Sequence, residues 1–201
     1  MAMTTGLTPQ TFENLQLNAG CFVAGVAISD IKTVSELKTA LTSAMNDPEK
    51  WLGATRGGGT FQCTPTIRNI DADGKRSEFV GSSVNDGWTV KMSTTLLEAT
   101  TENFKRVLLS ADVETSGSVT IIKPRTAIKP EDYINPVVWV GDTAYGLTAI
   151  ELDNVLNLAG ETFTFTDKGE GTLPFEFHAH QASLEDQEYA PCRIVFFDQA
   201  A

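Results

Sequence analysis

The sequence predicts a mainly β protein, an antiparallel β-sandwich or barrel with one or two flanking α-helices. Apolar and polar residues alternate one by one along several short segments, which is the pattern of strands that bury one face. Turn-forming residues separate these segments, and only two stretches show helical spacing instead. The predicted strands span residues 60–69, 88–95, 137–140, 148–152, 162–166, 175–180 and 193–197. The predicted turns lie at residues 73–74, 86–87, 128–136 and 167–171.

Two of the predicted strands carry phenylalanines on one face. Phe163 and Phe165 lie on one face of the first predicted strand, and Phe175 and Phe177 lie on one face of the second. A hairpin that turns at residues 167–171 would bring the four rings together as one side of a core.

The first helical segment is predicted over residues 34–45. Thr33 is a candidate N-cap, and Glu36, three residues later, completes a capping box. Apolar residues then recur at helical spacing, at Leu37, Ala40, Leu41, Ala44 and Met45.

A second helix is predicted to begin at a cap formed by Thr100 or Thr101 and to end at the Thr-Ser-Gly-Ser sequence of residues 115–118. Glu102 would lie near the positive end of this helix. The apolar stripe of the helix would consist of Phe104, Val107, Leu108 and Ala111.

Length and charge limit the classes of protein to which the chain can belong. Its 201 residues, 41% of them hydrophobic, suffice for one core, so we expect a single domain over residues 1–201. Fifteen basic and 26 acidic residues give a net charge of −11, which disfavours a protein that grips nucleic acid. The chain has no run of 18 apolar residues, and its first 16 residues lack the features of a signal peptide. We therefore expect a soluble protein that is made in a cytosol and contacts no membrane.

The three cysteines, Cys21, Cys63 and Cys192, are odd in number and show no Cys-x-x-Cys spacing. This pattern suits a reducing compartment, and we expect the three side chains to act as small hydrophobic groups.

The glycine-rich segment of residues 52–61 could belong to a phosphate-binding loop. Gly53, Gly58 and Thr60 fit the template of such a loop, but Gly59 stands where its lysine belongs. The alternating sequence that follows predicts a strand, whereas a phosphate loop leads into a helix. The glycines are better explained as flexible backbone where the chain enters a sheet.

Residues 69–74 resemble the beginning of a calcium loop, with Asn69, Asp71, Asp73 and Gly74 at its first, third, fifth and sixth positions. The twelfth position, which should be a bidentate glutamate, is Val80. The Asp-Gly pair between two predicted strands therefore favours the tip of a hairpin.

Glu176, His178 and His180 alternate along one predicted strand, as some zinc ligands do. Because no further histidine or suitably spaced cysteine completes the set, we interpret them as a solvated polar face. The chain also lacks the Gly-x-Ser-x-Gly motif of serine hydrolases. We expect no metal, no cofactor and no enzymatic activity, and a function carried by the protein surface.

The order of several segments resembles that of the tail tube proteins of long-tailed bacteriophages with non-contractile tails, particularly those of Gram-positive hosts. The resemblance covers nearly all 201 residues, and its most specific parts are Gly-Ala-Thr-Arg-Gly-Gly at 53–58 and Asp-Lys-Gly-Glu-Gly at 167–171. The family's hairpin tip more often has Glu and Gly where this chain has Asp71 and Ser77. The segments are residues 15–22, 52–61, 67–76, 96–113, 134–143, 163–180 and 190–197.

The resemblance implies a β-sandwich or barrel flanked by a helix, similar in fold to type VI secretion tube proteins. It implies subunits that form rings, hexameric in the expected case, which stack into a tube in the virion tail after synthesis in the bacterial cytoplasm. The implied partners are further copies of the chain and the tape measure, tail terminator and baseplate or tip proteins. Genomic DNA would pass through the lumen without specific binding. Six chains of charge −11 would carry about −66 formal charges, which a polyanion can pass without sticking.

Two candidate contact sites follow. Residues 67–88 are expected to form a long hairpin or loop that reaches from one ring to the next. Its tip, the candidate ring-to-ring contact, holds Asp71, Asp73, Gly74, Lys75 and Arg76. The candidate subunit-boundary loop consists of Arg56, Gly57, Gly58 and Gly59, where glycines permit the close approach of another chain.

The alternative function is a β-sandwich binding module, for instance a glycan-binding or adhesin-like domain of a tail or a cell surface. Such a module should expose a concave site lined by aromatic residues. Trp51, Trp88 and Trp139 lie in or beside apolar patterns, so we expect them in a core or an interface instead.

Overall fold

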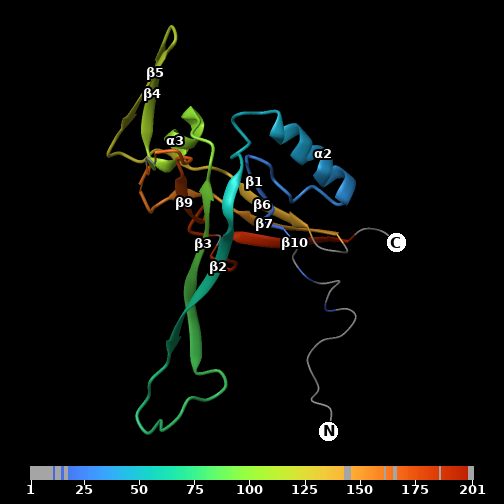
Figure 1. The fold of residues 1–201 in the computed structure, drawn as a ribbon. Helices are drawn as coiled ribbons and strands as arrows, with labels where there is room; N and C mark the ends of the chain where they lie inside the picture. The colour runs from blue at the N-terminus through green and yellow to red at the C-terminus, as the bar shows by residue number, and fades with distance from the viewer. Residues whose placement is uncertain are drawn as a thin grey trace.

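The computed structural model describes residues 11, 15, 18–142, 146–160, 162–164, 167–185 and 187–198. These residues form two four-stranded antiparallel sheets, a separate two-stranded hairpin and two short α-helices (Figure 1). The predicted fold class, a mainly β sandwich with flanking helices, is confirmed. None of the helices in the described part of the chain is long and apolar enough to cross a membrane.

The first sheet has the strand order β1-β6-β7-β10 and the second has the order β2-β3-β9-β8. The strands of the first sheet are β1 (Cys21–Ala24), β6 (Val137–Asp142), β7 (Gly146–Leu152) and β10 (Cys192–Asp198). Those of the second are β2 (Thr55–Asn69), β3 (Ser83–Leu96), β8 (Leu156–Asn157) and β9 (Leu173–His178). The remaining elements are α2 (Val34–Met45), α3 (Thr101–Val107), β4 (Ala111–Ser116), β5 (Val119–Pro124) and a 3-10 turn, η1 (Pro130–Asp132).

The first sheet is the middle layer of the molecule. One of its faces meets the second sheet, and side chains of both sheets form the main core. The buried members of this core include Phe22, Met92, Leu96, Val137, Leu152, Leu173, Phe175 and Phe177. The opposite face of the first sheet packs on α2, where Val138, Val140, Ala149 and Phe197 contact the buried Leu37 and Ala44.

Helix α2 spans the predicted residues. Thr33 accepts a hydrogen bond from the Glu36 N–H, and the Glu36 side chain accepts one from the Thr33 N–H, so the predicted capping box is present. The hydrogen bonds from the backbone of Lys32 and Thr33 lower the pKa of Glu36. Local capping and one apolar stripe suffice to define this helix.

The second predicted helix is too long, which corrects one expectation. Thr100 caps α3 through the Asn103 N–H, but the helix ends at Val107, and Ala111 already begins β4. The segment 115–118, expected as a helix end, is the turn between β4 and β5, with Gly117 at a φ of +61°. β-branched residues are frequent on both sides of this turn and favour paired strands over a continued helix.

The predicted hairpin that turns at residues 167–171 is present only in a reduced form. Among the described residues, Thr164 forms one isolated antiparallel bridge with Thr172 across this turn, and the strands beside β9 are β3 and β8. Phe163 packs edge-on against Phe104, with 5.4 Å between the ring centroids, and Phe165 lies outside the described residues. The long strand β3 occupies the position beside β9 that the predicted hairpin partner would have taken.

Asp86 and Gly87 do not form a turn. They lie within β3, opposite the register shift between Pro65 and Ile67 of β2, and the Gly87 φ is +151°. An extra residue in one strand is a β-bulge, which bends and twists a long hairpin. The Asp-Gly signal therefore marks a bulge here.

One carboxylate is buried between the first sheet and the segment that precedes α2. Glu151 of β7 is 1% exposed, and its Oε2 accepts a hydrogen bond of 2.6 Å from the Ile28 N–H. Its Oε1 lies 3.1 Å from the Arg193 Nε. Burial raises the pKa of Glu151, and the hydrogen bond from Ile28 and the charge of Arg193 oppose this only in part.

We expect Glu151→Gln to gain stability relative to the wild type as pH rises from about 4 to about 8. A raised folded-state pKa means that the folded protein binds this proton more tightly than the unfolded chain does. The corresponding stability is present below the usual pKa range of a carboxyl group and is lost as pH rises through the raised value. A glutamine at this position does not titrate, so the variant has no such loss.

Urea unfolding at a series of pH values measures this difference. Glu114→Gln, in the exposed part of β4 where Glu114 pairs with Lys123, is the comparison variant for loss of a surface carboxylate. A difference between Glu151→Gln and the wild type that stays constant with pH would contradict the buried-carboxylate interpretation.

Candidate functional site

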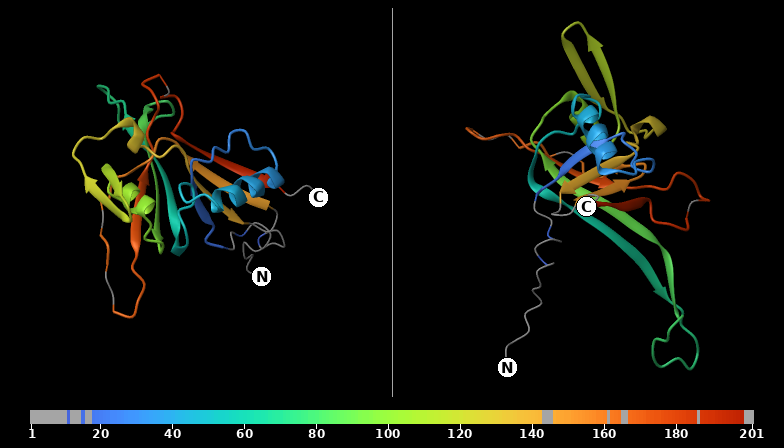
Figure 2. Two further views of the ribbon diagram at one scale, coloured as in Figure 1. Left: turned by 90° about the horizontal axis from the view of Figure 1, so that it is seen from above. Right: turned by 90° about the vertical axis from the view of Figure 1, so that its right-hand side faces the viewer.

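The β2–β3 hairpin projects far from the body of the molecule. It runs in the opposite direction to the β4–β5 hairpin (Figure 1), and a second view shows the same arrangement (Figure 2). The inner face of its stem continues the core through the cross-strand pairs Phe61 with Met92, and Cys63 with Val90. The next pair, Pro65 with Trp88, lies beyond the cover of the first sheet, and Trp88 is 41% exposed.

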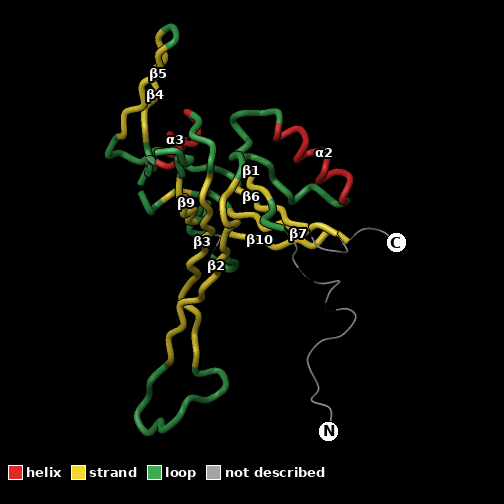
Figure 3. Tube along the Cα trace, viewed as in Figure 1, coloured by secondary structure: helices red, strands yellow, loops and turns green. Residues whose placement is uncertain are grey.

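The end of the hairpin exposes large apolar side chains. Residues 70–82 form the irregular loop at its tip (Figure 3). Phe79 is 63% exposed and Val80 is fully exposed. Ile67 and Ile70 are also about half exposed on the adjoining backbone. Apolar groups of this size at the end of a projecting hairpin are typical of a contact surface.

The loop at the tip is held together by its own polar groups. The Lys75 ammonium donates hydrogen bonds to the Ile70 carbonyl oxygen at 2.6 Å and to the Glu78 carboxylate at 2.9 Å. The Ser82 hydroxyl also donates to Glu78, at 3.0 Å. The hydrogen bond from Lys75, and to a smaller extent the one from Ser82, lower the pKa of Glu78.

The five residues predicted at the ring-to-ring contact therefore lie together at this tip, but they differ in availability. Lys75 has only 11% of its side chain exposed and fixes the loop from within. Gly74 adopts a φ of +86°, which only glycine adopts without strain. Among the ion pairs of the described residues, none includes Asp71, Asp73 or Arg76.

An ion pair crosses the hairpin at the bulge. Arg68 donates two hydrogen bonds to the Asp86 carboxylate, at 2.7 Å and 2.9 Å. The hydrogen bonds from Arg68 lower the pKa of Asp86. Because both side chains are substantially exposed, the pair orients the stem more than it stabilises it.

The glycine-rich segment proves to be the irregular start of β2, which corrects its description as a loop. Gly57 and Gly58 adopt φ values of +77° and +73°, and the pairing with β3 shifts between Thr55 and Gly59. A Cβ atom on Gly59 would lie 2.6 Å from the Ser93 carbonyl oxygen. Glycine is therefore needed at position 59 for backbone packing within the chain.

Arg56, at the start of this segment, pairs with Glu170, in the turn at residues 167–171. The hydrogen bond from Arg56 lowers the pKa of Glu170. The two segments that contribute most to the family resemblance thus touch each other through one exposed ion pair.

A groove opens beside the glycines, where the two sheets diverge. Its volume is about 560 Å³. The apolar groove is lined by Phe22, Phe61, Met92, Trp139 and Ile150, together with Gly57, Gly58, Gly59 and neighbouring residues 18, 19 and 60. Trp139 donates a hydrogen bond from Nε1 to the Ala19 carbonyl oxygen, which fixes the indole at the wall.

The edge strand β10 extends this apolar surface. Ile194 lies opposite Ile150 of the groove, and Phe196 lies opposite Thr148, so both point to the face that meets the second sheet. The second sheet does not reach them, since Ile194 is 50% exposed and Phe196 is 73% exposed. The sequence of this strand, Arg-Ile-Val-Phe-Phe, is apolar on both faces and predicts cover on both, but it does not predict that the cover on one face is missing.

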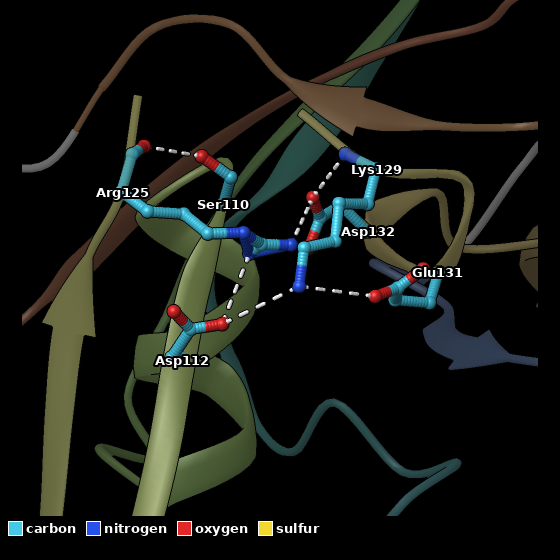
Figure 4. Close-up of polar contacts among 6 residues, drawn as sticks. All are labelled: Ser110, Asp112, Arg125, Lys129, Glu131 and Asp132. Atoms are coloured by element: carbon cyan, nitrogen blue, oxygen red, sulfur yellow. Dashed lines mark hydrogen bonds and ion pairs between the residues drawn. The ribbon is translucent and has the colours of Figure 1, made fainter. Parts of the chain in front are cut away.

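The base of the β4–β5 hairpin is fixed by a charged cluster (Figure 4). Arg125 donates two hydrogen bonds of 2.6 Å to Asp132 of η1, which is almost fully buried, and lies 3.6 Å from Asp112 of β4. The Lys129 ammonium lies 3.8 Å from Asp112 and 3.5 Å from Glu131. The cluster connects β4, β5 and η1 and fixes the direction in which the hairpin projects.

The residues weighed as zinc ligands are engaged elsewhere. His178 Nε2 lies 2.7 Å from Glu176 Oε1, and Lys91 also pairs with Glu176. His180 lies beyond the end of β9, where its Nδ1 is 3.0 Å from the Asn154 carbonyl oxygen. Within the described ranges, no group of three or more potential ligands could hold a metal ion.

A second hollow lies between the hairpin stem and residues 179–184 and 187–191. Its volume is about 840 Å³, and its wall includes Trp88, Tyr189 and His180, with polar side chains such as Asn85 and Glu188. Tyr189 is 75% exposed. Trp51 and Trp139 are half-buried, so of the three tryptophans only Trp88 departs from the expected core or interface environment within this chain.

Comparison with models of known protein families and with curated proteins finds no match to this chain.

Proposed function

We propose that this chain is a self-assembling structural protein that forms the rings of a bacteriophage tail tube. The observation that carries the proposal is β10, an edge strand that leaves Ile194 and Phe196 in water beside the apolar groove. A long edge strand with exposed apolar side chains is a liability in a monomer, because it invites another chain to pair with it. An assembly that buries this edge removes the liability.

In a ring, the β10 edge of one subunit would meet a different edge of the next subunit, such as β2. The β10 edge and the edge strand β2 belong to different sheets and have different side chains, so a contact between them would be heterologous. Heterologous contacts repeat from subunit to subunit and close into a ring when the rotation permits. The sequence resemblance supplies the expected number of six subunits.

The two projecting hairpins support stacking of such rings. They extend from the body in opposite directions, so a subunit can contact a ring on either side of its own. The exposed Phe79 and Val80 give the β2–β3 tip an apolar contact, and Asp71, Asp73 and Arg76 surround it with charge. Many weak contacts around one ring would add to a stable stack.

Negative-stain electron microscopy of the purified protein tests the proposal directly. Rings or tubes, formed alone or on addition of a tail-tip complex, are the expected result. A protein that stays monomeric at high concentration under both conditions contradicts it.

The first prediction concerns the β10 edge. We expect the double variant Ile194→Lys, Phe196→Lys to remain folded, because both side chains are already exposed, but to need at least about tenfold more protein for ring formation. The reason is that burying an unpaired ammonium in an apolar contact costs about 2 kcal/mol or more.

Analytical ultracentrifugation and microscopy measure the loss of rings. The matched control is Thr39→Lys, Thr42→Lys on the exposed face of α2, which adds the same charge away from the edge and should assemble normally. Normal assembly of the β10 variant would remove this edge from the interface.

The second prediction concerns the tip of the β2–β3 hairpin. Replacing residues 71–76 with a short Gly-Ser turn should leave folded subunits and intact rings but abolish their stacking into tubes, because the loop loses the Lys75 bonds that shape it. Tube length in electron micrographs is the readout.

The control for the tip is Asp71→Asn with Asp73→Asn, which keeps the length of the loop and the bonds of Lys75. Tubes in this control but not in the replacement would assign the contact to loop shape. Tubes of normal length and yield in both variants would contradict the ring-to-ring role.

The second candidate function, a glycan-binding module, is favoured by one observation. Trp88 and Tyr189 expose aromatic surface at a hollow of about 840 Å³ that also carries polar side chains, a combination suited to sugar rings.

For this function we expect the monomer to bind one class of oligosaccharide on a glycan array, and Trp88→Ala to abolish binding. Phe79→Ala, an exposed aromatic residue outside the hollow, is the control. An array without signal contradicts this function.

A further inference from the structure

Two cysteines from facing sheets meet at the edge of the main core. Cys63 of β2 shares the inner face of its strand with Phe61 and pairs with the buried Val90. Cys192, at the start of β10, pairs with the buried Leu152. Both side chains are half-buried and pack against the same core cluster, so they face each other across the interior of the sandwich.

The two thiols lie close enough to interact electrostatically, and both are free in this structure. Burial, then the neighbouring Cys63, then the more distant charge of Asp153, raise the pKa of Cys192 to about 12. At neutral pH this thiol is therefore protonated and a poor nucleophile.

We propose that Cys63 and Cys192 are a redox modification site, at which a disulfide bond joins the two sheets when the protein leaves a reducing compartment. The bond would tie the base of the β2–β3 hairpin to the edge strand β10. It would close a loop of more than a hundred residues, the kind of cross-link that restricts the unfolded chain most. This inference is independent of ring formation, since both thiols belong to one chain.

The oxidant is a low-molecular-weight disulfide of the glutathione class. The Cys63 thiolate attacks one sulfur of that disulfide, forms a mixed disulfide and releases one small thiolate. Cys192 then loses its proton to solvent, and its sulfur attacks the Cys63 sulfur and releases the second small thiolate. The two protons from the cysteines end on the two small thiols, and the two electrons that the cysteines lose reduce the small disulfide.

Burial keeps the Cys192 thiol protonated in the mixed disulfide as well, so the bond should form faster at alkaline pH than at neutral pH. Cys63 and Asp153 are the titratable groups that act on Cys192, and Glu185, Glu188, Tyr189 and Arg193 line the same hollow as Cys192. Asp153 is also 3.5 Å from Arg193.

The test uses the full chain, reduced and then incubated with oxidised glutathione at about pH 8.5, where more thiolate is present. Remaining thiols are alkylated, and peptide mapping by mass spectrometry locates the bond. We expect a Cys63–Cys192 link, with a rise in Tm of about 10 °C that dithiothreitol reverses.

Three variants separate this pair from the third cysteine. Cys63→Ala and Cys192→Ala should each prevent the link and the rise in Tm, whereas Cys21→Ala, on β1, should show both. Complete oxidation of the wild type without a Cys63–Cys192 peptide, or with a bond to Cys21 instead, overturns the inference. Because the wild-type peptide map decides the outcome, a variant that fails to fold does not leave it open.

Discussion

The rest of the structure depends on the first sheet having to be covered on both faces. Its strands alternate between residues that meet the second sheet and residues that meet α2, and both sets are apolar. Neither partner layer could exist alone, because the second sheet and α2 each have only one apolar face to bury. The order of layers, α2, first sheet, second sheet, follows from this requirement. It also explains Glu151, whose position in the middle layer leaves its carboxylate without water and in need of Ile28 and Arg193.

The same requirement shows where the protein is incomplete. The long strands of the second sheet, β2 and β3, continue into the projecting hairpin. The second sheet therefore leaves the edge strand β10 of the first sheet without cover. Ile194 and Phe196 are exposed on β10, and Trp88 is exposed on the hairpin stem, where the two sheets no longer face each other. Both exposed surfaces arise from a single fact, that the two sheets overlap only in part. A contact with another molecule at either place would continue the packing that the core begins.

The sequence predicted those elements whose signals are local. The capping box of Thr33 and Glu36 defines α2 without help from the fold, and Phe175 and Phe177 predict the buried face of β9 by alternation alone. The sequence-based prediction was wrong where the same short motif occurs in two kinds of local structure. Asp-Gly serves a turn or a bulge equally well, and Gly87 became a bulge because β2 and β3 continue their pairing past it.

The candidate site divides in the same way. That residues 71–76 lie at the tip of a hairpin follows from turn chemistry, whereas the use of Lys75 inside the loop depends on where Ile70 and Glu78 come to lie. The exposure of β10 could not be predicted, because it depends on the reach of another sheet. Cys63 and Cys192 are far apart in sequence, and only the packing of the two sheets brings them together.

The distribution of charge links the fold to the proposed tube. Nine of the fifteen lysines and arginines form ion pairs with carboxylates among the described residues, and their charges are therefore largely neutralised toward a third group. A phosphate chain that approached the surface would have to compete with those carboxylates for each cation. The excess of acidic residues remains, and its field repels a polyanion at distances within the screening length. A wall built from such subunits would resist binding of nucleic acid for two reasons, the net charge and the prior use of its cations, and both effects weaken as salt rises, because most of the ion pairs are exposed.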